Sequence, residues 1–509
     1  MYDLIIQNAM VIDGTGAEPF PADIAVQKGK IACIAPGLTG AKQVIDARGL
    51  VATPGFIDSH SHSDGKILSA PAQREKLEQG ITTAVGGQCG SSPAPSKKEG
   101  DLVTFGQFFQ RGSQLSLGCN HVVFVGHGAI RRAVMGNANE QPTPEQLEQM
   151  QALLRDAMEH GALGLSFGLI YNPGCYSKTE ELVALARVVA EYDGMVSAHI
   201  RNEGDYVEEA LEEFLRVLRE AKVRGVYSHH KSCGKKNHGK VHTTMAMLEQ
   251  AREEGVDVWC DAYPYTATST SLTAAFVDKV YRTGKAEDMA AAVSDRQIRE
   301  KLIASIHERW GDDLSWVLVT NCAGAPEYNG YDVGKIAAMR GTTHAEAALD
   351  LVRISPQKNA ACFFSIAEED MKFVIAHPLT MVCTDSGVAP VLKTFHPRLR
   401  GSFPRVLGRL VREEGVTSLP EMVRKMTSLP ASVYGIAGKG ILREGMDADI
   451  CVFDAKTIRD TADYLNPTLP NVGLNYVFVG GVLAAQDGVA TGDLAGRLLR
   501  AKEGAAAEA

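Results

Sequence analysis

Short apolar runs separated by glycine and proline mark both ends of this chain. They occupy residues 3–10, 24–26, 31–34, 449–453 and 476–483. Runs of this length that are bounded by turn residues predict β-strands. Because the two ends share this pattern and a long middle separates them, we predict one small β-sandwich domain built from both termini. It would comprise residues 1–54 and 420–490, with a helical link at about 420–437.

The middle of the chain alternates between apolar runs that end in polar or glycine residues and amphipathic helical stretches. The apolar runs occupy residues 55–62, 81–90, 121–127, 162–170, 195–201, 226–231, 256–265 and 380–386. Eight such strands alternating with helices predict an α/β fold, a parallel (β/α)8 TIM-like barrel over residues 55–420. The long gap before the last run predicts an insertion after strand seven, at residues 271–375, which can act as a lid. Residues 491–509 are expected to form a C-terminal tail whose Ala- and Glu-rich end, 501–509, frays.

Composition narrows the class of protein. Of the 509 residues, 45% are hydrophobic and 22% are charged, which is typical of a globular protein with a full core and excludes a disordered chain. The 52 Lys and Arg against 61 Asp and Glu give a net charge of −9, which disfavours nucleic-acid binding. Ten cysteines are too few for a disulfide scaffold. No apolar run is long enough for a membrane span, and the N-terminus has no features of a signal peptide, so we expect a cytoplasmic protein with reduced thiols.

Candidate chemistry gathers at the ends of the predicted strands, where barrels of this kind place their active sites. Metal-ligand or acid–base side chains end five of the runs: His60 and His62, Cys89, His199, His229 and Asp385. Side chains two apart on a strand share a face, so His60 and His62 can chelate one ion. A thiolate with two imidazoles suits zinc and leaves a fourth position open for water. Taken singly, each residue has a simpler interpretation as a polar turn, a buried structural cysteine or a satisfied histidine; their joint placement favours a metal centre.

Several sequence motifs carry a resemblance to known enzymes. GFIDSHSHSD, the TPGFID that overlaps it and LREGMDADICVFD resemble the amidohydrolase superfamily. The chain is more closely similar to the D-aminoacylase (N-acyl-D-amino-acid deacylase) family. The matching segments are GGQCG, GALGLSFGLIYNPG, SAHIRNEGD, YSHHK, DAYPYTA, TDS, HPRLRGSFPRVL and KMTSLPASVYGI. They extend from the first predicted strand to the C-terminal strands, so the resemblance covers nearly the whole chain.

The resemblance implies a ligand set for zinc. It assigns one tightly bound ion to Cys89, His199 and His229, and a second, weaker site that can be empty to His60, His62 and Asp385. It also makes Asp385 the catalytic acid–base group. Many members of the superfamily bridge two metals with a carboxylated lysine on strand four, but GALGLSFGLIY contains no lysine. This agrees with the D-aminoacylase pattern and argues against a dihydroorotase or a hydantoinase.

The expected activity is zinc-dependent hydrolysis of the amide bond of an N-acyl-D-amino acid. Zinc lowers the pKa of its bound water from about 15.7 towards about 7, and Asp385 would take the proton and pass it to the leaving amine. The free carboxylate of the substrate needs cationic and hydroxyl partners. Candidates near the strand ends are Lys231, Arg398, Tyr171, Tyr263 and Tyr265. In the resembling family such positions contact the substrate carboxylate or the tetrahedral intermediate, although packing at the barrel rim explains the tyrosines equally well.

Alternative activities stay open at this point. One is hydrolysis of a related amide, such as N-acyl-D-glutamate, N-acyl-D-aspartate or a D-dipeptide. A second cation in the side-chain pocket would distinguish these, and Arg400 and the Lys and Arg residues of the insertion are candidates. Another is a non-catalytic, amidohydrolase-like assembly protein, but such relatives lose metal ligands and this chain keeps all six. The expected partner is a small-molecule N-acyl amino acid, with no nucleic acid or membrane. The preference for D over L rests on the resemblance alone, and oligomeric state is left open.

Overall fold

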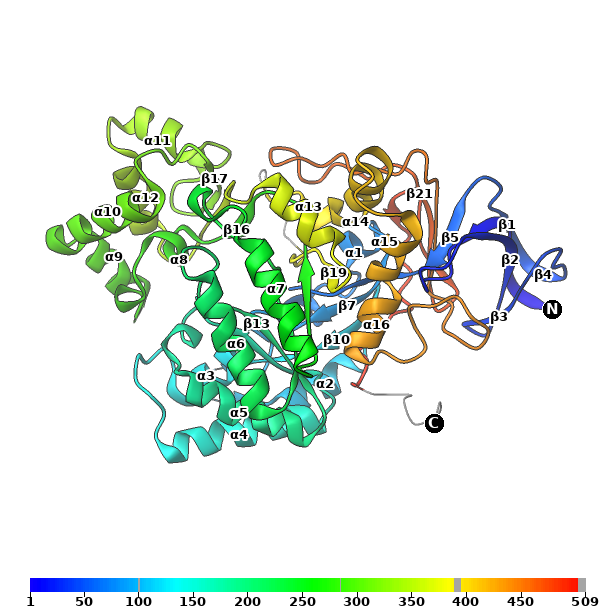
Figure 1. Cartoon of the computed structure of the whole chain (residues 1–509), viewed down its shortest axis with the longest axis horizontal. Helices are drawn as coiled ribbons and strands as arrows, with labels where there is room; N and C mark the ends of the chain where they lie inside the picture. The colour runs from blue at the N-terminus through cyan, green and yellow to red at the C-terminus, as the bar shows by residue number, and fades with distance from the viewer. Residues whose placement is uncertain (99–100, 284, 389–394, 502–509) are drawn as a thin grey trace.

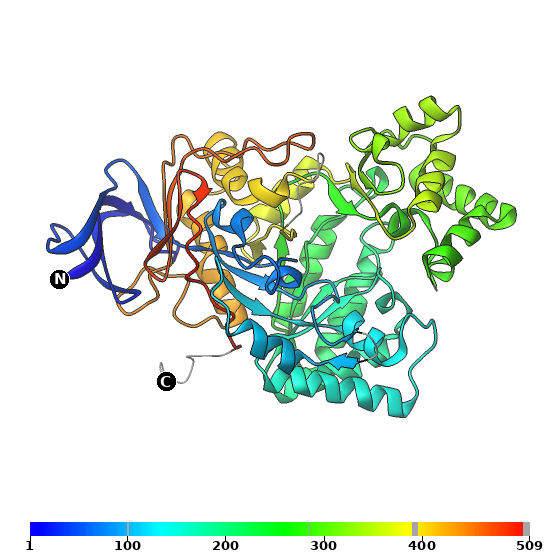
Figure 2. The ribbon, with the colours of Figure 1, turned by 180° about the vertical axis from the view of Figure 1, so that it is seen from behind.

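The structure is a computed structural model that describes residues 1–98, 101–283, 285–388 and 395–501. Figures 1 and 2 show an elongated molecule with β-strands from both ends of the chain at one side and the helices α9 to α12 at the other. Between them lies the part that alternates strands and helices. The end of the tail that we expected to fray lies, beyond residue 501, outside the described residues.

The two ends of the chain build one sheet, in the order β23-β22-β21-β20-β5-β1-β2-β3, with β4 beside β1. Its strands are β1 (Tyr2–Val11), β2 (Phe20–Gln27), β3 (Lys30–Ala35), β4 (Ala41–Asp46), β5 (Val51–Pro54), β20 (Ile450–Phe453), β21 (Leu474–Val479), β22 (Val482–Gln486) and β23 (Val489–Ala490). Antiparallel pairing of β5 with β20 joins the N-terminal half to the C-terminal half. Buried aliphatic side chains from both halves, including Ile6, Ile24 and Ile450, form a separate hydrophobic core.

The parallel strands of the middle follow each other in sequence order. They are β6 (Phe56–Asp58), β7 (Ile81–Gly86), β10 (Asn120–Val123), β11 (Val125–Gly126), β12 (Gly164–Gly168), β13 (Met195–His199), β14 (Arg224–Tyr227), β15 (Val258–Ala262) and β19 (Thr380–Val382). Two sheets result, β6-β7-β10 and β11-β12-β13-β14-β15-β19. The first and last strands approach each other, because Ser59 Oγ donates to Val382 O at 2.9 Å and Ser61 forms a parallel bridge with Ser386.

Helices occupy the segments between these strands. They are α1 (Arg74–Leu77), α2 (Phe105–Gly112), α3 (His127–Met135), α4 (Pro144–Glu159), α5 (Thr179–Glu191), α6 (Val207–Ala221), α7 (Lys240–Glu253) and α13 (Glu368–Ala376), followed by α14 (Arg398–Arg405), a π-helical turn η6 (Val406–Glu413), α15 (Leu419–Met426) and α16 (Ser428–Tyr434). A short hairpin of β8 (Ser96–Lys98) and β9 (Asp101–Val103) precedes α2. Helix α4 begins with a capping box between Thr143 and Gln146. Its apolar face, with Met150 and Leu154, is buried, as the amphipathic pattern predicts.

The strands are shorter than the apolar runs suggest. Strand β6 ends at Asp58, β7 at Gly86, β14 at Tyr227 and β19 at Val382. His60 and His62 therefore lie after the strand and do not share one of its faces. The prediction that strand alternation pairs them is wrong, although the two side chains do lie close together. The same shift places Cys89, His229 and Asp385 in the loops that follow their strands.

The segment between β15 and β19 has a core of its own. It contains β16 (Thr268–Thr270), α8 (Leu272–Phe276), α9 (Ala286–Ser294), α10 (Arg296–Trp310), β17 (Val317–Cys322), α11 (Val333–Arg340), α12 (His344–Ile354) and β18 (Asn359–Phe363). Strand β18 lies between β16 and β17 in a small antiparallel sheet, so this insertion is not purely helical. Helix α13 falls inside the range predicted for the insertion, but it packs against α7, β15 and β19.

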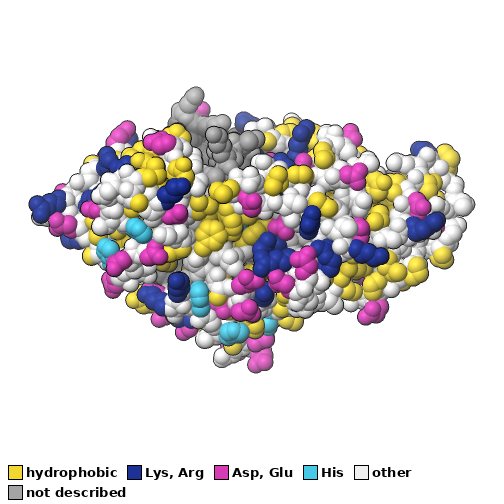
Figure 3. All heavy atoms as spheres, turned by 90° about the horizontal axis from the view of Figure 1, so that it is seen from above, with side chains coloured by type: hydrophobic (Ala, Val, Ile, Leu, Met, Phe, Trp, Pro, Cys, Tyr) yellow, Lys and Arg dark blue, Asp and Glu magenta, His cyan; other side chains and the backbone are white. Residues whose placement is uncertain are grey.

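The chain before residue 502 returns to the start of β10 and the residues that precede it. Leu117 N donates to Gly496 O, and Leu499 N donates to His121 O at 2.7 Å. Seen from above, basic and acidic side chains are interspersed over the molecule (Figure 3). Among the described residues, no helix combines the length and apolar character that crossing a bilayer requires.

Candidate metal centre and active site

Cys89 lies at the centre of the predicted ligand set. Its Sγ is 3.3 Å from His229 Nε2 and 3.7 Å from His199 Nδ1. His60 Nε2 approaches the same sulfur at 3.3 Å. The ligand atoms of Cys89, His199 and His229 all lie within 4.8 Å of one another, so one ion can reach all three.

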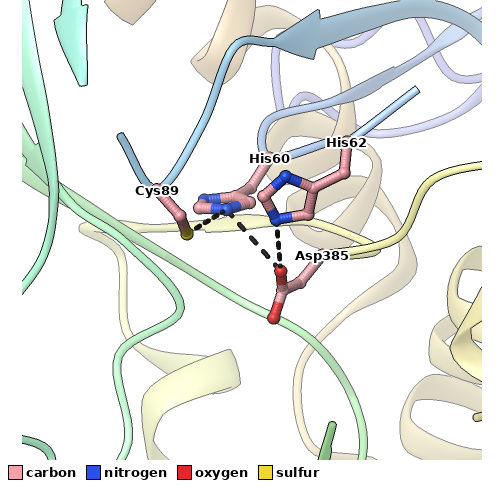
Figure 4. Close-up of side chains that lie close together, drawn as sticks. All are labelled: His60, His62, Cys89 and Asp385. Carbon is pink, nitrogen blue, oxygen red and sulfur yellow. Dashed lines mark hydrogen bonds and ion pairs between the residues drawn. The ribbon is translucent and has the colours of Figure 1, made fainter. Parts of the chain in front are cut away.

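A second group of ligand atoms shares Cys89 with the first. It adds His60, His62 and Asp385, again with all ligand atoms within 4.8 Å (Figure 4). Asp385 Oδ1 is 3.1 Å from His62 Nε2 and 3.6 Å from His60 Nε2. The structure thus brings together all six predicted metal-ligating side chains, in two overlapping groups.

Backbone conformation explains how loop residues aim at one point. Cys89, His229 and Asp385 have positive φ angles of 52°, 40° and 47°. Non-glycine residues rarely occupy this region, and such strain concentrates at functional sites. Glycine also makes room: a Cβ atom on Gly168, at the end of β12, would lie 2.0 Å from Cys89 O. The close approach of β12 therefore requires glycine at this position.

The electrostatics favour ionised ligands. Burial raises the pKa of the Cys89 thiol, but the positive charge of His60 and His229 outweighs it and holds that pKa well below its usual value. Burial likewise raises the pKa of Asp385, and Arg398 reverses the effect. Arg398 Nη1 donates to Asp385 Oδ2 at 2.6 Å, and both side chains are almost fully buried. The sulfur is thus in the form that binds metals, and the aspartate in the form that accepts a proton.

Two carboxylates outside the predicted set also touch the imidazoles. Glu203 Oε1 is 2.5 Å from Lys231 Nζ and 3.0 Å from His229 Nδ1, and its Oε2 is 3.6 Å from His199 Nε2. Asp261 Oδ2 is 3.5 Å from His60 Nδ1, and its Oδ1 accepts from the backbone N of His229 at 2.6 Å. Glu203 follows His199 by four positions in SAHIRNEGD, but a loop has no periodicity from which the direction of its side chain could be inferred.

The candidate substrate-binding residues divide into two sets. Lys231, Tyr171 and Tyr263 lie around the centre: the ring of Tyr171 is 5.0 Å from that of His199. The ring of Tyr263 lies 5.0 Å from the Arg398 guanidinium and 5.7 Å from Lys231 Nζ, and its hydroxyl is buried without a partner among the described residues.

Tyr265 and Arg400 are directed elsewhere. The ring of Tyr265 packs at 4.8 Å against the Arg405 guanidinium and at 4.9 Å against the ring of His396. Arg400 Nη1 pairs with Glu78 Oε2 at 2.7 Å. Tyr265 therefore reaches the centre only through its neighbours, and Arg400 is engaged in a structural ion pair.

A cavity of about 370 Å³ is lined by residues of the loops beside the centre and by residues of the insertion. Glu203 and Leu169 line it on the barrel side, and Arg282, Trp310 and Phe363 line it on the other. Its size suits a small molecule. The Nε of Arg282 is buried and has no hydrogen-bond partner in the described part of the chain.

Comparisons with known proteins agree with this geometry. The model named "Amidohydrolase family" matches residues 43–485. A D-aminoacylase from Alcaligenes xylosoxydans xylosoxydans is 34% identical, over 98% of this chain and 97% of the relative. An N-acyl-D-glutamate deacylase from the same organism is 36% identical over 94% and 93%.

A solved structure gives the same result. The N-acyl-D-glutamate deacylase from Bordetella bronchiseptica, crystallised with zinc and a phosphonate that mimics the tetrahedral intermediate, superposes with a TM-score of 0.84. It is 36% identical and covers 98% of this chain and 100% of its own. The resemblance inferred from the motifs is thereby confirmed. This chain belongs to the amidohydrolase family, in the group formed by D-aminoacylase and the N-acyl-D-amino-acid deacylases.

Proposed function

We propose that this protein hydrolyses the amide bond of N-acyl-D-amino acids, releasing a carboxylate and a free D-amino acid. The observation that carries the proposal is the convergence of one thiolate and two imidazoles on a single point beside an ionised Asp385. The names of the relatives, a D-aminoacylase and an N-acyl-D-glutamate deacylase, support the substrate class.

The donor set fits zinc. Cys89, His199 and His229 supply sulfur and nitrogen ligands, the combination that zinc prefers, and leave room for a fourth ligand. His60, His62 and Asp385 would hold a second, weaker ion together with Cys89. Zinc, when bound here, lowers the pKa of water and polarises the acyl carbonyl.

Asp385 is the group that moves the proton. It accepts a proton from the attacking water as the new bond to the acyl carbon forms. It then donates that proton to the amide nitrogen as the C–N bond breaks, so that the products are a carboxylic acid, which ionises, and an amine. Because Arg398 and His62 contact opposite oxygens of Asp385, its carboxylate is held in one orientation.

Lys231, Arg398, Tyr171 and Tyr263 would bind the substrate around this group. Arg398 has a planar fork that matches a carboxylate, and it lies beside Asp385. The unpartnered hydroxyl of Tyr263 is a free donor in a buried position. Tyr265 would act indirectly, by packing against Arg405 and His396.

Acidic substrates are the second candidate, and one observation favours them. The cavity beside the centre is lined by Arg282, whose buried Nε lacks a partner in the described part of the chain, and by Arg309. An N-acyl-D-glutamate or N-acyl-D-aspartate would bring its second carboxylate to such cations. Substituting Arg282→Gln should then lower kcat/KM for N-acetyl-D-glutamate far more than for N-acetyl-D-leucine. Equal losses on the two substrates would remove this candidate.

The test of the main proposal is amine release from a panel of N-acetyl amino acids, D and L of each. Zinc-loaded and chelator-stripped protein would be compared, with Asp385→Asn alongside. We expect zinc-dependent release from D-substrates, and a loss of about 10²- to 10⁴-fold in kcat for Asp385→Asn with the tight zinc retained. Zinc-loaded protein that releases no amine from any member of the panel would overturn the proposal.

We also propose the finer architecture. The approach of β6 to β19 through Ser59, Ser61 and Ser386 supports a closed (β/α)8 barrel, and the separate core of the terminal strands supports a β-sandwich domain at 1–54 and 420–490. The insertion would cover the cavity as a lid. All ten cysteines are free thiols, which supports the reducing environment of the cytoplasm.

A further inference from the structure

One carboxylate faces both imidazoles of the Cys89–His199–His229 group from the side away from the sulfur. His229 presents Nε2 to Cys89, and its opposite nitrogen, Nδ1, is 3.0 Å from Glu203 Oε1. His199 presents Nδ1 to Cys89, and its opposite nitrogen, Nε2, is 3.6 Å from Glu203 Oε2. That Nε2 is buried and has no hydrogen-bond partner in the described part of the chain. The two histidines thus present different nitrogens to Cys89, and Glu203 faces the remaining nitrogen of each.

Lys231 competes with Glu203 for the outer nitrogen of His229. Lys231 Nζ is only 2.8 Å from His229 Nδ1. An ammonium has donors and no acceptor. A histidine binds a metal in its neutral form, which carries a single ring proton. If Lys231 donated to Nδ1 in that form, the ring proton of His229 would sit on Nε2, the atom that faces Cys89, and Nε2 could not bind a metal. Glu203 and Lys231 therefore favour opposite tautomers of the same imidazole.

The geometry points to Glu203 as the positioning residue that decides this competition: its negative charge favours ring protons of His229 and His199 on the nitrogens that face away from Cys89. It does so in two ways. Its Oε1 lies 3.0 Å from His229 Nδ1, within reach of a proton on that nitrogen, and the same oxygen takes the ammonium of Lys231 at 2.5 Å. Lys231 also donates to His229 O at 2.9 Å, so its donors have partners other than the ring. Carboxylates that orient metal-ligating histidines typically change metal affinity by about 10- to 100-fold.

The loop around Glu203 is built to hold it there. Glu203 O accepts from Cys233 N at 2.7 Å, and the side chain of Asn202 accepts from Gly204 N at 2.8 Å and from Tyr206 N at 3.0 Å. The first bond ties the loop after β13 to the loop after β14, and the other two shape the loop that carries Glu203. The backbone of Glu203 is thereby positioned so that its carboxylate meets Lys231 and both rings.

The inference rests on the proposed zinc site, and its test measures zinc affinity rather than turnover. The zinc dissociation constant of the full chain would be measured by competition with a chromogenic chelator. Glu203→Gln keeps the size of the side chain but removes its charge and replaces one of the two acceptor oxygens by an amide donor, so it cannot favour outward ring protons on both imidazoles. We expect zinc binding to weaken by about 10- to 100-fold, and the charge-transfer absorption from Cys89 to Co²⁺, used as a spectroscopic substitute, to weaken in parallel.

Glu213→Gln is the matched control. Its side chain is 16% exposed against 13% for Glu203, and it pairs with Arg201. Unchanged zinc affinity in this variant, with both variants folded by circular dichroism, excludes a general effect of losing a buried negative charge.

The double variant Glu203→Gln/Lys231→Met tests the competition itself. Removing the ammonium removes the donor that favours the wrong tautomer, so the double variant should bind zinc more tightly than Glu203→Gln. A purely structural role for Glu203 predicts no such recovery. The inference is overturned if Glu203→Gln binds zinc as the wild type does, or if Lys231→Met restores nothing. If the wild-type protein binds no zinc, both the proposed function and this inference fail. If the wild-type protein hydrolyses its substrate with zinc and Glu203→Gln has unaltered zinc affinity, only this inference is refuted.

Discussion

Replacing Arg398 by glutamine tests the substrate-binding side of the proposed site. Arg398 donates to Asp385 from a position that is 8% exposed, and its guanidinium stacks on Tyr263. A hydrogen bond to a charged group contributes about 1.5–3 kcal/mol, and every 1.4 kcal/mol is tenfold. If Arg398 binds the substrate carboxylate, Arg398→Gln should lower kcat/KM by roughly 10- to 150-fold, mainly through KM.

The same substitution affects folding, and this must be separated from binding. Asp385 would keep His62 at 3.1 Å but lose its closest cation. Leaving a buried charge without a partner costs about 3–5 kcal/mol of stability, and the remaining contact with His62 places Arg398→Gln at or below the lower end of that range. Urea denaturation, followed by circular dichroism, measures this cost directly.

Arg400→Gln is a matched control on the same helix. Arg400 lies two positions further along α14 and also pairs with a largely buried carboxylate, Glu78, at 2.7 Å. The Arg400→Gln variant should have a lower free energy of unfolding than the wild type, with little change in KM for an N-acetyl-D-amino acid. An unchanged KM in Arg398→Gln, or an equal rise in both variants, would refute the assignment of Arg398 to the substrate carboxylate.

Three further predictions concern the metal centre and the core. Cys89→Ser replaces the shared sulfur ligand, so zinc content measured by atomic absorption after dialysis should fall below one tenth of the wild-type value; full retention would contradict the ligand assignment. Gly168→Ala should likewise lose zinc while keeping its circular dichroism spectrum, because the added Cβ would lie 2.0 Å from Cys89 O. His121→Asn should change the pH dependence of stability. Burial, with Lys76, lowers the pKa of His121 to about 3, so the unfolded imidazole takes up a proton below its usual pKa of 6.5 and the folded one does not. The free energy of unfolding therefore falls as pH drops from 6.5 towards 3, by about 1.4 kcal/mol per unit for this group. Urea denaturation at pH 7, 6 and 5 should show a shallower fall in the variant, and parallel curves would contradict the pKa shift.

The sequence predicts the order of the strands better than their ends. Apolar runs followed by glycine or polar residues identify each parallel strand, because strands buried on both faces are apolar along their whole length. The runs overestimate strand length where buried polar residues follow the strand, as at Ser228 to Lys231, because β14 already ends at Tyr227. The insertion was located by its length, but its small sheet was not predicted, since short strands such as β16 carry few apolar residues.

The site was predicted by residue type and position rather than by geometry. His60 and His62 were paired by strand alternation, yet they lie after β6, and Cys89, His229 and Asp385 each occupy a left-handed backbone conformation. That conformation costs of order 1–3 kcal/mol for a residue with a side chain. Glycine at these positions would relieve the strain but would remove the sulfur, the imidazole or the carboxylate. Three strained residues at the ends of three different strands, all directed at one point, are what a site selected for function rather than for stability requires. Glu203 completes the argument: no pattern in the sequence gives its direction, because only the fold brings the loop after β13 to the imidazole at the end of β14.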